Sequence, residues 1–163
     1  MSPPADRELV AAARAARALA YAPYSGYRVG AALLTAGGEV VRAANVENAS
    51  YGLTLCAERA AVVTAVAAGH RRFETVAVAA RGPGPAAICG ACRQVLREFP
   101  AGLGLRVLLA GESGDEIVAT TLADLLPASF GPERLGRDPE GDFRSGPGPG
   151  SGPGLGSGEG RDG

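Results

Sequence analysis

The 163-residue sequence has no tryptophan and no lysine, one histidine and three cysteines. Three cysteines form a poor disulfide framework, and they fit metal binding in a reducing compartment better. The single histidine, His70, follows Gly69 at the expected end of a helix, so we expect a solvated cap there and no metal role. Every basic residue is arginine, which together with the abundant alanine and glycine indicates the coding bias of a GC-rich genome.

Other features that are missing exclude whole classes of partner. A net charge of −1 gives no indication of a nucleic-acid surface. No apolar run approaches the length of a membrane span, and the N-terminus has no basic segment followed by an apolar one, so no signal peptide is expected. We therefore expect a cytoplasmic protein with no nucleic-acid and no membrane partner.

Hydrophobic periodicity and turn signals predict one α/β domain over residues 1–135. The expected elements are, in order, a helix over residues 6–20, a hairpin of two strands over 27–35 and 40–46, a helix over 56–68 and a strand over 75–80. A helix starting near residue 89, strands over 105–110 and 117–120 and a last helical turn over 121–126 are expected to follow. This order predicts a five-stranded mixed sheet with helices on both faces. Residues 136–163 are rich in glycine, proline and serine, which predicts a disordered tail.

The three cysteines fall into two short clusters, Cys56 and the pair Cys89 and Cys92. Both clusters are expected to open helices, where free backbone N–H groups favour the thiolate that binds metal. Structural zinc sites usually have four protein ligands, whereas catalytic sites leave the fourth position to water. Three thiolates therefore predict a catalytic zinc site.

Glu58 and Arg59 lie two and three residues after the lone cysteine. A carboxylate beside an open zinc position can carry protons to and from bound water. Residues two apart in a helix point in different directions, so Cys56 and Glu58 face one site only if Cys56 lies at the cap or in a distorted first turn. Three thiolates and Zn²⁺ sum to −1, and Arg59 is expected to offset part of this charge, with Arg93 as a second candidate.

Together, NVENASYGLTLCAERAA and CGACRQVL resemble the cytidine deaminases, specifically the small three-cysteine form that assembles as a homotetramer. The resemblance covers about residues 5–130. It implies the three-layer α/β/α fold of that family, one zinc per subunit and hydrolytic deamination of cytidine and deoxycytidine in pyrimidine salvage. Ile88 departs from the family pattern, which usually has proline before the first cysteine of the pair.

The resemblance also implies roles for individual residues. Cys56, Cys89 and Cys92 would bind zinc, and Glu58 would move protons and contact N3 of the base. Asn45 and Glu47 would hold the ribose hydroxyls. The further substrate-binding residues would be Ala57, Tyr27 in a position that usually holds phenylalanine, and Tyr51 and Phe130, which would reach into a neighbouring subunit's site.

Alternatives remain for several of these residues and for the function. The cysteines can form a structural zinc site, Asn45 and Glu47 can be ordinary turn residues, and Tyr27 can be core packing. The rival functions are deamination of a cytosine-containing antibiotic such as blasticidin S, editing of cytosine in nucleic acid, and a zinc-stabilised interaction module. Asn45 and Glu47 argue against the first, the net charge against the second, and the lack of a fourth cysteine against the third.

Overall fold

The computed structural model describes residues 5–82 and 84–138 of the chain. A five-stranded mixed sheet has the order β2-β1-β3-β4-β5, in which only β3 and β4 run parallel. The strands are β1 (Val29–Thr35), β2 (Val40–Ala44), β3 (Phe73–Ala80), β4 (Arg106–Gly111) and β5 (Ile117–Thr121). The predicted sheet and its hairpin are confirmed.

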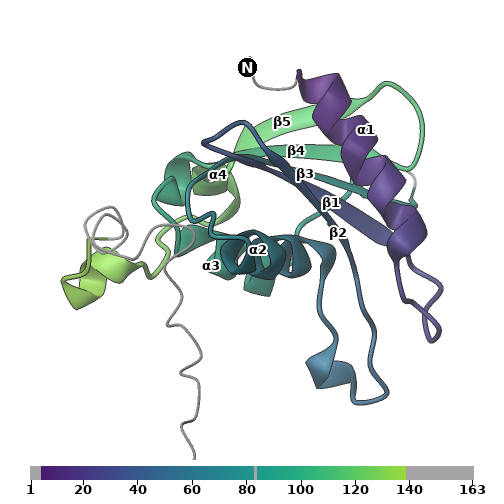
Figure 1. Cartoon of the computed structure of the whole chain (residues 1–163), viewed down its shortest axis with the longest axis horizontal. Helices are drawn as coiled ribbons and strands as arrows, with labels where there is room; N and C mark the ends of the chain where they lie inside the picture. The colour runs from purple at the N-terminus through teal and green to yellow at the C-terminus, as the bar shows by residue number, and fades with distance from the viewer. Residues whose placement is uncertain (1–4, 83, 139–163) are drawn as a thin grey trace, which may run out of the picture.

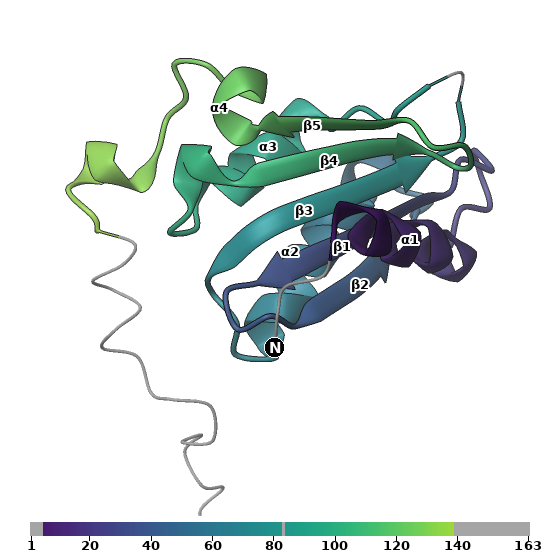
Figure 2. The ribbon, with the colours of Figure 1, turned by 90° about the horizontal axis from the view of Figure 1, so that it is seen from above.

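Helices cover both faces of this sheet, as predicted (Figures 1 and 2). On one face lies α1 (Asp6–Ala16), and on the other lie α2 (Ala57–Ala67), α3 (Gly90–Arg97) and the short α4 (Leu122–Leu125). Two buried clusters match these layers. Alternate β1 residues divide between them: Ala32 and Leu34 pack with α1, while Ala31 and Leu33 pack with α2 and α3.

Several predicted boundaries were wrong by a few residues. The first helix ends at Ala16 and continues as the 3₁₀ turn η1 (Arg17–Leu19). The second strand ends at Ala44 rather than at residue 46, because Val46 leaves the hairpin to bridge Tyr21 on one side and Leu55 on the other. This exchange of partners brings the loop after η1 beside residues 45–47.

Two segments extend away from the body of the fold (Figure 1). One carries the 3₁₀ turn η2 (Tyr51–Leu53), and the other follows α4 to the 3₁₀ turn η4 (Pro132–Leu135). In the part of the chain that the structure describes, no helix combines the length and the hydropathy that a membrane span requires. Most of the predicted tail, residues 139–163, lies outside the described residues.

Candidate active site

Two helix starts bring the three cysteines together. Cys56 is the N-cap of α2 and Cys89 the N-cap of α3, each with extended backbone angles, and Cys92 lies in the first turn of α3. Because Cys56 sits at the cap and outside the helix proper, it and Glu58 both face one cavity, which resolves the conflict in helical direction. The prediction that both clusters open helices is confirmed.

The sulfur positions suit a tetrahedral metal. Cys89 Sγ lies 4.0 Å from Cys56 Sγ and 3.4 Å from Cys92 Sγ, and all three sulfurs lie within 4.8 Å of one another. A zinc ion bound by thiolates at about 2.3 Å places neighbouring sulfurs roughly 3.8 Å apart. The donor set therefore fits Zn²⁺, and among the described residues the metal-ligand grouping consists of these three cysteines.

His70 does not complete this site. Its Nε2 lies 2.7 Å from Glu39 Oε2, so the imidazole pairs with the β1–β2 hairpin. The His70 side chain is 30% exposed, and among the described residues it is not part of the metal-ligand group. A closed four-ligand site, which the interaction-module alternative requires, finds no support in the residues described.

The thiols differ in their environment. Burial opposes ionisation of Cys89, but hydrogen bonds from Cys92 and Cys56 lower the pKa of its thiol overall. Burial, followed by the charge of Glu58, raises the pKa of Cys92. Zinc binding must therefore displace a proton from the buried Cys92 thiol, and metal affinity should rise with pH.

Arg59 places a cation against the sulfur cluster. Its Nη2 donates to the Thr54 carbonyl oxygen at 2.8 Å and lies 3.7 Å from Cys56 Sγ. The hydrogen bond to Cys56, and then the charges of Cys56 and Cys92, raise the pKa of the Arg59 guanidinium. Arg59 Nε is buried and has no hydrogen-bond partner among the described residues. A guanidinium held here compensates thiolates, so it supports the fit to a cationic metal.

Arg93, the second candidate for this role, contacts backbone instead. It donates through Nε to the Ile88 carbonyl oxygen at 2.8 Å and through Nη1 to the Leu125 carbonyl oxygen at 2.6 Å. It thereby ties the loop before α3 to the end of α4. Ile88 itself is 1% exposed, so its side chain anchors this loop in the core.

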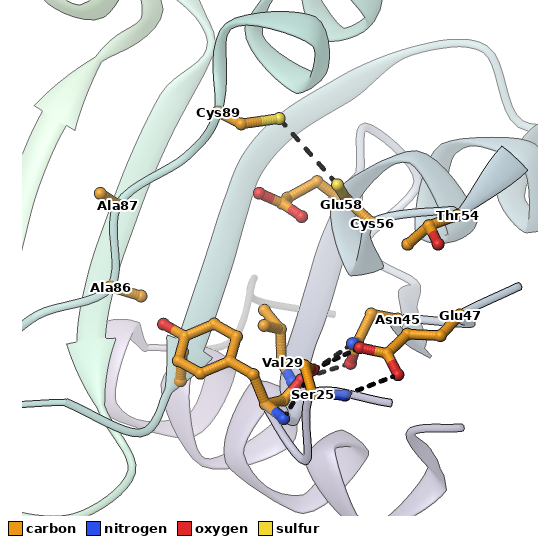
Figure 3. Close-up of a pocket in the computed structure, with 12 residues that line it drawn as sticks. Ser25, Val29, Asn45, Glu47, Thr54, Cys56, Glu58, Ala86, Ala87 and Cys89 are labelled. Atoms are coloured by element: carbon orange, nitrogen blue, oxygen red, sulfur yellow. Dashed lines mark hydrogen bonds between the residues drawn. The ribbon is translucent and has the colours of Figure 1, made fainter. Parts of the chain in front are cut away.

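A cavity of about 270 Å³ adjoins the sulfurs, and most predicted site residues line it (Figure 3). Cys56, Cys89 and Glu58 lie at one end, and Asn45 and Glu47 lie across from them. The sequence reasoning missed the other lining residues, which are Ser25, Val29, Thr54, Ala80, Ala86 and Ala87. Their small or β-branched side chains carry no metal-ligand or motif signal, so only the folded chain identifies them.

Glu58 is the buried acid of the cavity. Its side chain is 4% exposed, and burial raises the pKa of its carboxyl group. Such a shift brings a carboxyl group towards the range in which it can both accept and return protons near neutral pH. The arrangement suits general acid–base chemistry at an atom held between Glu58 and the sulfurs.

The remaining predicted residues lie at the margin. Tyr27 lines the cavity and is 43% exposed, so it is not core packing. Ala57 is fully buried and is not among the residues that line this cavity. Tyr51 lines an adjoining cavity of about 300 Å³, and Phe130 lies on the second extended segment; their exposures are 74% and 59%.

The chain's residues 3–103 match the family model of the cytidine and deoxycytidylate deaminase zinc-binding region. The chain is 47% identical over 128 residues to a cytidine deaminase of Sporosarcina psychrophila, which covers 78% of this chain and 93% of that protein. It is 48% identical over 132 residues to one of Halalkalibacterium halodurans, covering 80% and 98%. A crystal structure of cytidine deaminase from Burkholderia pseudomallei matches with a TM-score of 0.75 and 50% identity, covering 78% and 100%.

The fold and the three-sulfur site thus define a zinc-binding deaminase of the α/β/α class. Within that class, the chain belongs to the cytidine deaminase family.

Proposed function

We propose that this enzyme hydrolyses cytidine and deoxycytidine to uridine and deoxyuridine, releasing ammonia, as a step of pyrimidine salvage. The observation that carries the proposal is the shared cavity, in which a buried carboxyl group stands beside three sulfurs and faces polar groups suited to a sugar. Reduced thiols at the centre of the site suit the cytoplasm, where we place the enzyme.

Cys56, Cys89 and Cys92 would hold one zinc ion per subunit. When bound, zinc lowers the pKa of a water molecule so that it can serve as a nucleophile at neutral pH. Arg59 would offset the excess negative charge of the three thiolates.

Glu58 would perform the proton transfers. Its carboxylate takes one proton from the attacking water and delivers it to N3 of the base, then takes the second from the hydroxyl group now on C4 and delivers it to the departing amine. Water supplies both hydrogens and the oxygen, so the carboxylate ends the cycle as it began. Burial supports this role because it destabilises the charged carboxylate.

Asn45 and Glu47 would recognise the ribose. The Asn45 side chain accepts from the Val29 N–H at 2.9 Å and donates to the Tyr27 carbonyl oxygen at 2.9 Å. One N–H and one lone pair remain for a sugar hydroxyl. Hydrogen bonds led by that from Ser25 lower the pKa of Glu47, which keeps it an ionised acceptor. Tyr27 and the Ala57 backbone would contact the base.

We further propose a homotetramer with composite sites. The two extended segments expose Tyr51, Leu53, Phe130 and Leu135, at 74%, 71%, 59% and 69%. Exposed apolar side chains on projecting segments favour burial against another subunit. Light scattering on the active enzyme tests this; full activity per chain in a monomer would contradict it.

The substrate is tested by following ammonia release from cytidine, deoxycytidine, CMP and blasticidin S with one zinc-loaded preparation. We expect turnover of the two nucleosides and little of the nucleotide or the antibiotic. Preferential turnover of blasticidin S would favour the rival deaminase function. A protein that zinc stabilises but that turns over none of the four compounds would favour the interaction module.

A further inference from the structure

The carboxylate of Glu47 is held in place by one short loop. Its Oε2 accepts the Tyr24 N–H at 2.8 Å and the Ser25 N–H at 3.2 Å. Its Oε1 accepts the hydroxyl hydrogen of Ser25. Both carboxylate oxygens are therefore fixed from the same loop, and Ser25 supplies two of the three donors.

Backbone pairing fixes this loop against the segment that carries Glu47. The Tyr21 N–H donates to the Asn45 carbonyl oxygen at 3.0 Å, and the Glu47 N–H donates to the Tyr21 carbonyl oxygen at 2.8 Å. Gly26 turns the chain with a φ of 64°, a region that favours glycine. The approach of Ser25 to Glu47 is therefore set by the backbone rather than by chance contact of exposed side chains.

The Ser25 hydroxyl has a defined orientation. Its oxygen accepts the Tyr27 N–H at 2.9 Å, and its one hydrogen is directed at Glu47. The Tyr27 carbonyl oxygen accepts from Asn45 Nδ2, so a continuous set of hydrogen bonds joins Asn45 to Glu47. Both proposed sugar-binding side chains are thus positioned through residues 25–27.

We propose that Ser25 is a positioning residue for sugar recognition, which acts by holding the Glu47 carboxylate ready to accept a ribose hydroxyl. The inference rests on the proposed role of Glu47. A carboxylate offers about four acceptor positions, and the loop occupies three of those of Glu47. One acceptor position, with a fixed direction, therefore remains for a ribose hydroxyl.

Pre-organisation is the physical reason for an effect on binding. Glu47 is only partly buried, and a free glutamate side chain loses rotamer freedom when a ligand fixes it. In this structure the loop has already fixed it before the sugar arrives. The same hydrogen bond from Ser25 is the main cause that lowers the pKa of Glu47, which agrees with a donor aimed at the carboxylate.

The test compares Ser25→Ala, Ser25→Thr and the control Ser113→Ala, a serine in the loop between β4 and β5 that is remote from the cavity. Loss of one hydrogen bond to a charged group predicts a roughly ten-fold rise in KM for cytidine in Ser25→Ala, with kcat little changed. Ser25→Thr keeps the hydroxyl and should restore most of the affinity. Ser113→Ala should match the wild type.

The second readout separates sugar recognition from general damage to the site. Inhibition constants are measured for uridine and for 1-methyluracil, which has the base but no sugar. Ser25→Ala should weaken uridine about ten-fold and leave 1-methyluracil unchanged. Equal weakening of both ligands, or no weakening of uridine, would overturn the inference.

A Glu47→Gln variant distinguishes this inference from the proposed function. If Glu47→Gln raises KM and Ser25→Ala adds nothing in that background, Ser25 acts through Glu47. If Glu47→Gln raises KM but Ser25→Ala alone has no effect, only the role of Ser25 fails. If Glu47→Gln leaves KM unchanged, the ribose assignment of Glu47 fails and the inference fails with it.

Discussion

Replacing Gly30 by alanine adds one methyl group where α1 crosses the sheet. Gly30 lies in β1 between Ala44 of β2 and Ala79 of β3. A Cβ on Gly30 would overlap the Ala13 carbonyl oxygen and would also meet the backbone nitrogen of Arg17. These are backbone atoms of α1 and its continuation, so no side-chain rotation relieves the overlap.

The helix must therefore move away from the sheet in Gly30→Ala. Overpacking of a well-packed core costs about 1–3 kcal/mol. For a folded domain of this size, each kcal/mol lowers the melting temperature by roughly 3–5 °C, so we expect a fall of about 3–15 °C. Movement of η1 also displaces the following loop, which holds Ser25, so KM for cytidine should rise while zinc content stays near one per chain.

Thermal melting followed by circular dichroism measures the stability, with zinc content and KM taken from the same preparation. Gly104→Ala is the matched control, because a Cβ at Gly104 meets no atom within 4 Å. A Gly30→Ala variant that melts within about 1 °C of Gly104→Ala would refute the close approach of α1 to β1.

Three further predictions concern charge, packing and the tail. Arg59→Gln should lower turnover per bound zinc and move the rising limb of the pH–rate profile to higher pH, whereas an unchanged profile would make Arg59 a structural residue only. Arg97→Ala should cost about 1–3 kcal/mol in chemical unfolding, because it removes a buried side chain together with its hydrogen bonds to Ser129 and Glu133; a loss below about 0.5 kcal/mol would contradict this. A chain ending at residue 136 should keep its turnover and melting temperature, and a large loss of either would show that the tail folds against the body.

The sequence was sufficient for the elements and for the sulfur cluster. The hairpin turn after β1 and the helical spacing in α1 are local signals, and the cysteine pair and the glutamate two residues after Cys56 carry their chemistry in their spacing. Helix geometry left two ways for Cys56 and Glu58 to face one site, a cap position or a distorted first turn, and the structure has Cys56 at the cap. The predictions of elements depend on residues close together in the chain, whereas the meeting of Cys56 with Cys89, 33 positions away, was predicted because three thiolates are needed for one metal site.

Long-range contacts could not be predicted in this way. Ser25 is an ordinary turn residue in sequence, and its contact with Glu47 spans 22 positions. Arg93 lies beside Cys92 in sequence but binds the carbonyl oxygen of Leu125, because the end of α4 packs there. Tertiary packing, and not local propensity, decides which donor meets which acceptor.

We propose that Glu58 transfers the protons of deamination inside a zinc-binding cavity. Glu58→Gln keeps the size of the side chain and its capacity for hydrogen bonds, but it removes the carboxyl group that takes up and gives up protons. General acid–base steps contribute roughly 10²–10⁴-fold each, so turnover of cytidine should fall by at least about 10²-fold.

The decisive measurement is therefore kcat of Glu58→Gln per bound zinc, with zinc content and cytidine binding determined on the same sample. We predict zinc near one per chain, cytidine binding close to that of the wild type, and turnover reduced by about 10²-fold or more. A variant that binds zinc and retains more than about a tenth of wild-type turnover would contradict the assignment of Glu58.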